Sequence, residues 1–419
     1  MSLSDVPLIL MIVGLAAYCV LGGADFGAGF WSLQPGRAAH ARTVRAYVHH
    51  AMGPVWEANH VWLIFVLAVC WTAYPTAFAS ILSTLEVPLF LAGLGIILRG
   101  TAYALRSEYA GIREEQLVGR IFGVSSVVTP YALGAAIGGI ASRRVPVGNA
   151  EGDLVTSWIN PTSTLIGALA VATAAYMAAV YLAADAARMR ESDLAQAFRV
   201  RALGTGLVAG ALALGGLVVV REDAEPLWNG LTSGAGLAAV IVSALAGIAT
   251  LALVWRGRFE PARFSAAIAV TAIVAGWALA QRPTFLPGLT VDDAAAGHST
   301  LVGVVASVAL GAVVLIPSLV LLFGLVLRGR FDASPEGEAG AGLAPARGRS
   351  VPLLPIAGVA LAVGLACTLV LDTGWTLVIG VLGLLAFIFV GFAAIASAAV
   401  GGDRTDTDHP GEGSGELTA

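Results

Sequence analysis

Three ionisable residues stand inside long apolar stretches near the N-terminus. Asp25, Glu57 and Arg99 are each flanked by apolar neighbours. A charge at membrane depth is costly, so each of these side chains needs a partner or a task. One interpretation is a buried ion pair of Arg99 with Asp25 or Glu57, because a guanidinium can hold a carboxylate through two parallel hydrogen bonds.

The other interpretation of these charges is a proton path. Two acids share one guanidinium, so one acid is less well compensated, and desolvation favours its protonated form. Glu57 and His60 are spaced to share a helix face, with His50 earlier on the same face. A histidine near a helix end is more commonly a solvated surface residue. The run of His50, Glu57 and His60 nevertheless favours a relay.

The composition indicates which elements must position these residues. Of 419 residues, 58% are hydrophobic and 12% are charged, whereas soluble domains carry about 25% charged residues. Such a chain cannot cover a globular surface with polar groups, which excludes a soluble enzyme, a disordered scaffold and a nucleic-acid binder. We predict an all-α polytopic membrane protein.

Apolar runs of helical length divide the chain. A bilayer core of about 30 Å needs roughly 20 helical residues, and about eleven runs qualify. They are 5–31, 53–73, 77–105, 118–141, 162–186, 200–220, 230–255, 263–281, 298–327, 351–371 and 374–400. These runs lack the alternation of period two that transmembrane strands require, so we expect no strands.

The basic residues predict the orientation. All 23 are arginines, and most of them follow the first, third, fifth, seventh and ninth runs. By the positive-inside rule the N-terminus lies outside and the C-terminus is cytoplasmic. Asp25, Glu57 and Arg99 then occupy one layer near the cytoplasmic ends of three consecutive spans. Glu86 is expected deeper in the third span, on its outer half, with no partner that the sequence names.

The remaining segments are polar and carry no motif. Residues 1–330 form the main membrane domain of nine spans, 331–350 a flexible cytoplasmic linker, 351–400 an extra transmembrane hairpin and 401–419 a disordered polar tail. The cysteines, Cys19, Cys70 and Cys367, lie in apolar runs and have no Cys-x-x-C neighbour, so neither a disulfide framework nor a metal site is expected.

Three stretches resemble elements of subunit II of the cytochrome bd quinol oxidases. GGADFGAG at 22–29 resembles the family's D-G-F-D-x-G-x-G, and GPVWEANHVWL at 53–63 resembles its G-P-x-W-D-G-N-x-x-W-L. Leu98-Arg99-Gly100, followed by Arg106, resembles its F-R-x-x-x-[FY]-x-x-R. The resemblance covers about residues 5–330, and the hairpin at 351–400 lies beyond it.

The resemblance implies a fold and a role. The fold is two four-helix bundles with a ninth helix, in the bacterial cytoplasmic (inner) membrane among its lipids. The chain would be the non-haem partner of a larger subunit I, which carries three haems, of types b and d. The complex oxidises quinol and reduces dioxygen to water, with protons supplied from the cytoplasm. Whether a structural quinone also contacts this chain stays open.

The resemblance also implies roles for particular residues. Asp25 and Glu57 would be the acids of the proton path, with His60 and His50 beside them on the second span. The site-shaping residues would be Trp56, Asn59, Trp62, Arg99 and Arg106. Glu57 stands where the family usually has Asp, Ala58 replaces a Gly and Gly22 replaces the first Asp.

Two other functions remain alternatives at this stage. Eleven spans with buried charges also fit a stand-alone secondary transporter, although the interior prolines are scattered rather than symmetric between halves. A third alternative is a scaffold that only supports and shields its partner. Solute uptake by the chain alone would favour the transporter, and substitution of Glu57 separates the scaffold from the proton path.

Overall fold

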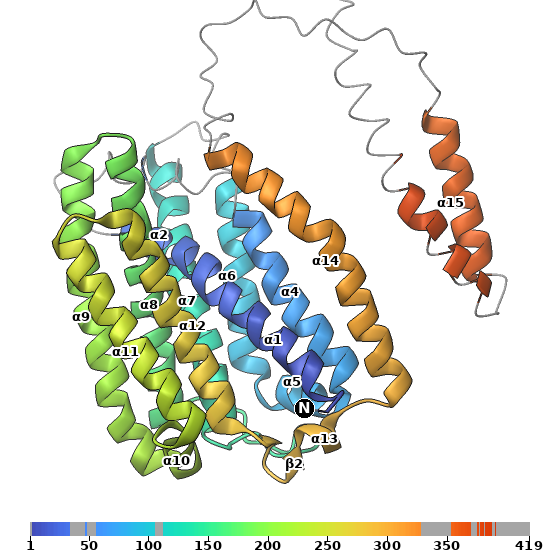
Figure 1. Ribbon diagram of the computed structural model, residues 1–419, viewed down its shortest axis with the longest axis horizontal. Coiled ribbons are helices and arrows are strands. Elements are labelled where there is room, and N and C mark those ends of the chain that lie inside the picture. Colours follow the sequence, from blue (N-terminus) through green and yellow to red (C-terminus); the bar gives the residue numbers. More distant parts are fainter. Residues whose placement is uncertain are drawn as a thin grey trace, which may run out of the picture. The chain divides into compact units, whose positions relative to one another are not determined.

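The first apolar run forms one span made of three helical pieces (Figure 1). The computed structural model describes residues 2–33, 47, 56–104, 112–327 and 353–369, with short segments between 375 and 390. Helix α1 (Asp5–Ala17) passes into a π-helical turn, η1 (Tyr18–Gly22), and then into α2 (Gly23–Ser32). The predicted first span is thus confirmed, and it contains a turn that hydrophobicity alone does not indicate.

The third run is divided, which corrects the prediction of one span over 77–105. After α4 (Trp56–Ala73), the chain forms the short helix α5 (Pro75–Thr84) and then α6 (Glu86–Ala104). Pro88 lies in the first turn of α6. In a continuous helix its ring would clash with the backbone carbonyl four residues earlier, so the helix breaks at Leu85. Glu86 is the first residue of α6, where a carboxylate is favourable, and it is exposed on the surface of the chain; its depth in the membrane stays a prediction.

Long helices account for the following runs. They are α7 (Ile112–Ala141), α8 (Pro161–Arg188), α9 (Ser192–Asp223), α11 (Gly234–Trp255), α12 (Phe259–Gln281) and α14 (His298–Leu327), with a short α10 (Glu225–Leu231) between α9 and α11. In the described part of the chain, 8 helices are long and apolar enough to cross a membrane. Shorter apolar helices at Asn59–Ala73, Pro355–Cys367 and Val378–Phe387 coincide with the remaining runs. The membrane-spanning helical class is confirmed, and the count of eleven stays a prediction.

A small hairpin between α12 and α14 departs from the prediction that there are no strands. Strand β1 (Thr284–Leu286) pairs antiparallel with β2 (Leu289–Thr290), ahead of the short helix α13 (Val291–Ala294). The turn between the strands is Pro287-Gly288, and Gly288 has φ +76°. Proline followed by glycine is the preferred sequence of such a turn, because only glycine adopts positive φ without strain.

Helix α8 lies at the centre of the packing among the described helices and contacts α2, α7, α9 and α12. Its buried face is rich in alanine, and small residues let helix backbones approach closely in a membrane. The closest approach is at Gly27 of α2, where an added Cβ would stand 1.8 Å from the carbonyl oxygen of Ala174. The Trp31 indole also donates to the Ala175 carbonyl at 2.9 Å. The division into two four-helix bundles stays a prediction.

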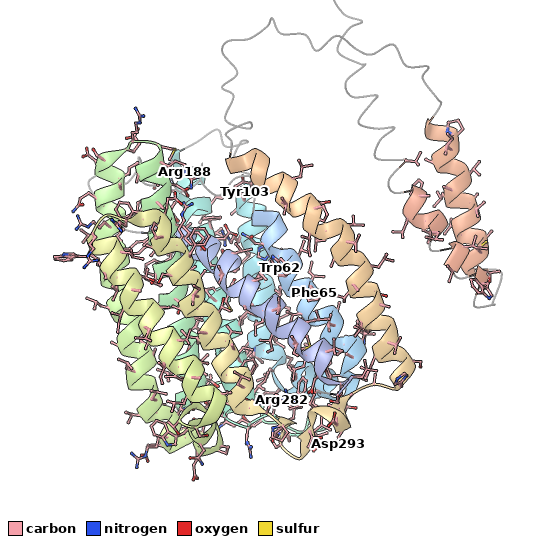
Figure 2. The ribbon with its side chains drawn as sticks, in the orientation of Figure 1. Trp62, Phe65, Tyr103, Arg188, Arg282 and Asp293 are labelled. Carbon is pink, nitrogen blue, oxygen red and sulfur yellow. The ribbon has the colours of Figure 1, made fainter. Side chains whose placement is uncertain are left out.

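Ion pairs mark the two ends of the helical bundle. Figure 2 shows Arg188 at one end, and Arg282 and Asp293 at the end that holds the N-terminus. The Arg282 guanidinium donates to Asp5 at 2.6 Å, and Arg188 donates to Glu260 at 2.7 Å. Such pairs suit the two polar borders of a membrane-spanning unit.

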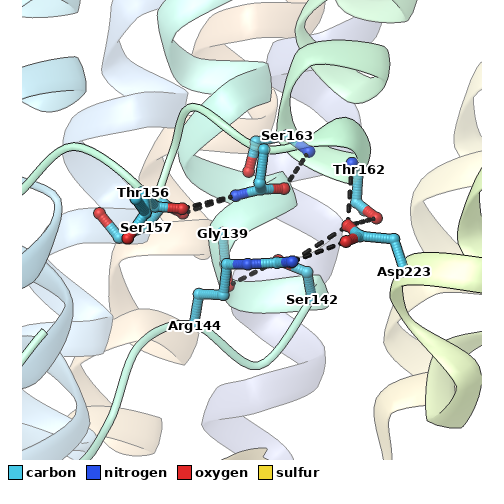
Figure 3. A network of polar contacts seen from close by, with 9 residues as sticks. Gly139, Ser142, Arg144, Thr156, Ser157, Thr162, Ser163 and Asp223 are labelled. Carbon is cyan, nitrogen blue, oxygen red and sulfur yellow. Dashed lines mark hydrogen bonds and ion pairs between the residues drawn. The ribbon is translucent and has the colours of Figure 1, made fainter. Parts of the chain in front are cut away.

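A network of polar side-chain contacts joins the end of α9, the start of α8 and the loop after α7 (Figure 3). The Arg144 guanidinium donates to both carboxylate oxygens of Asp223, at 2.6 and 3.1 Å. Asp223 also accepts from the backbone N–H of Thr162 at 3.1 Å and from its hydroxyl at 2.6 Å. At the neighbouring N-cap of α8, the Asn160 side chain accepts from the Ser163 N–H at 2.8 Å. Asp223 thus links the end of α9 to the start of α8 and to the loop after α7.

Replacing Asp223 with alanine is expected to destabilise this end of the bundle. The change removes a partly buried ion pair and leaves the Thr162 N–H at a helix start without its acceptor, which costs about 1–3 kcal/mol. Thermal unfolding in detergent measures the loss. The matched control is Glu260→Ala, because the Arg188–Glu260 pair is exposed and such pairs contribute at most about 1 kcal/mol. Equal losses of melting temperature in the two variants would contradict the prediction.

The chain divides into two compact units, Met1–Ala333 and Ser334–Ala419. In the second unit, α15 (Leu353–Leu369) contacts the segment 382–387: a Cβ added at Gly364 would meet the Leu384 nitrogen at 2.8 Å. Such an approach is typical of a helical hairpin with small residues at its interface. The predicted linker at 331–350 and the predicted tail at 401–419 lie outside the described residues. The assignment of 351–400 as a transmembrane hairpin stays a prediction.

Candidate functional site

Arg99 and Asp25 form a buried ion pair between α6 and α2. One guanidinium nitrogen of Arg99, Nη2, donates to the Asp25 carboxylate oxygen Oδ1 at 2.8 Å and to the Asp25 backbone carbonyl at 3.0 Å. The two side chains are 2% and 4% exposed. The predicted pairing of Arg99 is thus confirmed with Asp25. Arg99 of α6 thus binds both the carboxylate and the backbone carbonyl of Asp25.

Aromatic rings enclose the guanidinium. The Arg99 guanidinium carbon lies 4.7 Å from the centre of the Phe26 ring and 4.9 Å from that of Phe122. Rings at this distance attract a cation and also exclude water from it. A charge pair in such a place is little screened, so Asp25 and Arg99 influence each other strongly.

The second carboxylate oxygen of Asp25, Oδ2, is buried and has no hydrogen-bond partner among the described residues. Burial of a carboxylate favours its neutral form, and the neighbouring Arg99 favours its charged form. An acid that is bonded at one oxygen and open at the other can accept a proton without giving up its ion pair.

Glycines bring α2 and α6 against α7 at this level. A Cβ added at Gly29, one turn after Asp25, would stand 2.1 Å from the Ser126 hydroxyl oxygen. A Cβ added at Gly95, one turn before Arg99, would stand 2.2 Å from the Thr129 hydroxyl oxygen. The ion pair therefore lies where α2 and α6 approach α7 closely, and larger residues at these two glycine positions would separate the helices.

Helix α4 contributes the second group of predicted residues. Asn59 is 6% exposed, and its side-chain amide donates to the Leu21 carbonyl at 3.4 Å. The His60 Nδ1 lies 3.4 Å from the Tyr18 hydroxyl, and its ring centre is 5.8 Å from that of Phe26. The start of α4 thus lies against the π-helical turn that precedes Asp25.

The structure brings some of the predicted residues together and does not describe others. Trp62 packs at the edge of a cluster formed by Tyr18, Phe26 and Ala174, and Figure 2 shows it on α4. Trp56 and Glu57 belong to α4, but their side chains lie outside the described part of the structure. His50 and Arg106 also lie outside the described residues.

Sequence reasoning did not identify the aromatic residues of the site. Tyr18, Phe26 and Phe122 stand in apolar runs, where an aromatic residue most often belongs to the core. Phe26 follows Asp25 directly, which is the only signal that the sequence offers. The contact of Phe26 and Phe122 with the Arg99 guanidinium becomes visible only when the helices are packed.

Comparison with known proteins places this arrangement in a wider context. The family model described as cytochrome bd terminal oxidase subunit II matches residues 3–326. The chain is 29% identical over 133 residues to the cytochrome bd ubiquinol oxidase subunit 2 of Bacillus subtilis, a match that covers 32% of this chain and 38% of that protein. It is 26% identical over 132 residues to the cytochrome bd-I ubiquinol oxidase subunit 2 of Escherichia coli K12, covering 32% of this chain and 34% of that protein.

A solved structure has the same fold. The bd oxidase from Geobacillus thermodenitrificans aligns with a TM-score of 0.62 and 23% sequence identity, over 78% of this chain and 99% of the matched chain. The sequence matches to the two curated relatives span only about a third of their lengths. The structural match therefore supports the fold, and the family model supports the relationship over most of the chain.

Proposed function

The chain belongs to the cytochrome bd terminal oxidase subunit II family, and on this basis we propose that it is the non-haem subunit of a membrane quinol:dioxygen oxidoreductase. In this role it supports a haem-bearing subunit I and supplies part of the path for the protons that are consumed when dioxygen is reduced to water. The substrates of the complex are quinol and dioxygen.

The observation that carries the proposal is the buried Asp25–Arg99 pair, with one carboxylate oxygen of Asp25 open. A purely structural pair is best stabilised when all its polar atoms are bonded. An open oxygen on a buried acid is instead what a proton carrier requires, because a proton must be able to arrive and leave.

The other members of the proposed path lie on the second span. Protons would enter from the cytoplasm near His50 and reach Asp25 through Glu57 and His60. The contacts of Asn59 and His60 with the π-helical turn support this, because Glu57 precedes Asn59 by less than one helical turn. Arg99 would stabilise Asp25, and Trp56, Trp62 and Arg106 would shape the surroundings.

The oxygen chemistry would belong to haems b and d in the partner subunit. In the described residues of this chain, no group of three or more His, Cys, Asp and Glu could hold a metal ion. The half-buried His60 places its Nδ1 at 3.4 Å from the Tyr18 hydroxyl and packs its ring near that of Phe26. In this proposal the chain holds and moves protons, in a bacterial inner membrane with its N-terminus outside and its C-terminus in the cytoplasm.

Replacing Glu57 with glutamine tests the proton path. The variant keeps the size of the side chain but cannot ionise, so oxygen consumption by the complex should fall about 100-fold, the lower end of the range for a lost proton-transfer group. The reduced-haem bands of the complex should be unchanged. Glu86→Gln is the matched control, because Glu86 is exposed at the start of α6, and it should keep the wild-type rate.

Several outcomes would contradict this proposal. If Glu57→Gln and Asp25→Asn both turned over at the wild-type rate, the chain would be a scaffold without a proton role. Haem bands from the purified chain alone would refute its non-haem assignment. Solute uptake in liposomes by the chain without a partner would support a secondary transporter instead.

A further inference from the structure

The π-helical turn Tyr18–Gly22 interrupts the first span and ends three residues before Asp25, which is about 4.5 Å of helix rise at roughly 1.5 Å per residue. The Gly23 N–H donates to the carbonyl of Tyr18, five residues back, which is the bond of a π-helix. Such turns are rare, and they are frequent at functional sites. The extra residue in the turn rotates everything after it by about 100° relative to a continuous α-helix.

This rotation decides where Asp25 points. Before the turn, α1 presents Gly14 to α4, where an added Cβ would stand 2.8 Å from the Phe65 ring. After the turn, α2 presents Gly27 to α8 and Asp25 to Arg99. If the turn closed into an α-helix while α1 stayed in place, Asp25 would rotate by about 100°, away from the guanidinium.

Two consecutive residues of α4 contact the turn. The Asn59 amide donates to the carbonyl of Leu21 inside the turn at 3.4 Å, and the His60 Nδ1 faces the hydroxyl of Tyr18, the first residue of the turn, at 3.4 Å. A side chain that bonds into the ladder of helix hydrogen bonds is one of the known causes of a helix distortion. Asn59 is also buried, so its amide has few other partners to choose from.

We propose that Asn59 is a positioning residue for Asp25. Its amide holds the π-helical turn open through the Leu21 carbonyl, and the open turn aligns the Asp25 carboxylate with Arg99. The inference rests on the proposed proton role of Asp25 for its activity test, and on geometry alone for its structural test.

The activity test uses Asn59→Leu in the complete complex. Leucine has the same branching but no donor, so oxygen consumption per assembled haem should fall about tenfold, the rate equivalent of one buried hydrogen bond. Asn59→Gln keeps the amide and should recover part of the rate. The control is Thr250→Val, which removes a buried polar group of a different helix, a hydroxyl that donates to the Ala246 carbonyl at 2.8 Å, and this variant should keep the rate.

A double-mutant cycle separates positioning from general damage. If Asn59 acts through Asp25, adding Asn59→Leu to Asp25→Asn should change the rate less than about twofold, because the interaction is already lost. A further tenfold loss on that background would overturn the inference. If Asp25→Asn alone kept the wild-type rate, the proposed function would fail at Asp25, and the structural test would then decide about Asn59.

The structural test is a structure of the Asn59→Leu complex. The inference expects the turn at 18–22 to close into an α-helix and the Asp25 carboxylate to leave Arg99. A persistent π-helical turn with the Arg99–Asp25 contact still at 2.8 Å would refute it, whatever the activity of the variant. Haem content measured on the same preparation shows whether the complex has assembled.

Discussion

Replacing Arg99 with methionine is expected to prevent assembly of a stable complex. Asp25 would then be a buried carboxylate without its counter-charge, since the two side chains are 2% and 4% exposed. Removing one partner of such a pair costs about 3–5 kcal/mol, a large part of the stability of a typical domain. The yield of haem-containing complex and its melting temperature in detergent measure the loss.

The charge-neutral double variant Asp25→Asn with Arg99→Met gives this prediction its second half. Replacing both charges removes the unpaired ion, so assembly should return, because such replacements are often close to neutral. Oxygen consumption should nevertheless stay slow, because the protonatable oxygen is gone. A double variant with the wild-type rate would show that the pair is only structural.

Arg188→Met serves as the control for these variants. Its guanidinium is 43% exposed and pairs with Glu260, which is 52% exposed. Pairs in water contribute about 0–1 kcal/mol, so this variant should assemble normally. A loss equal to that of Arg99→Met would mean that any missing arginine impairs the chain, irrespective of burial.

Replacing Gly27 with alanine is expected to separate α2 from α8. The added Cβ would stand 1.8 Å from the oxygen and 2.3 Å from the carbon of the Ala174 carbonyl, both of which are backbone atoms. Because a backbone cannot rotate out of the way, α8 must shift, at a cost of about 3 kcal/mol, the upper end of the usual range for overpacking. A lower melting temperature of the complex and a lower yield measure this cost.

Gly23 provides the matched control four residues earlier in the same helix. A Cβ added at Gly23 would meet no atom within 4 Å. Alanine is favoured over glycine inside a helix by about 0.5–1 kcal/mol, so Gly23→Ala should be neutral or slightly stabilising. Equal melting temperatures for the Gly23 and Gly27 variants would contradict the close packing of α2 on α8.

The sequence predicted the depth of the site residues in the membrane but not their direction around the helix axis, because the π-helical turn lies directly before Asp25. The apolar lengths predicted the spans, because crossing a bilayer is a local requirement on about 20 consecutive residues. They also predicted that Asp25 and Arg99 share a layer, because depth follows from position along a helix. Rotation about the helix axis does not follow in this way, since one extra residue in η1 changes it by about 100°.

Other differences have similar causes. The single third span expected over 77–105 is two helices, because Pro88 breaks the helix although the residues around it form a continuous apolar run. The Arg144–Asp223 network joins residues far apart in the chain, and nothing in their local sequences indicates the contact.

The sequence by itself determined that this is a helical membrane protein with an acid and an arginine at one depth, because hydrophobic length and the cost of buried charge act on each segment separately. The tertiary structure decided that Arg99 bonds Asp25, that Phe26 and Phe122 enclose the guanidinium, and that Asn59 reaches the Leu21 carbonyl. These contacts depend on the rotation of four helices about their own axes. That rotation is set by packing between helices at glycines such as Gly27 and Gly29, so the sequence of one helix alone does not determine it.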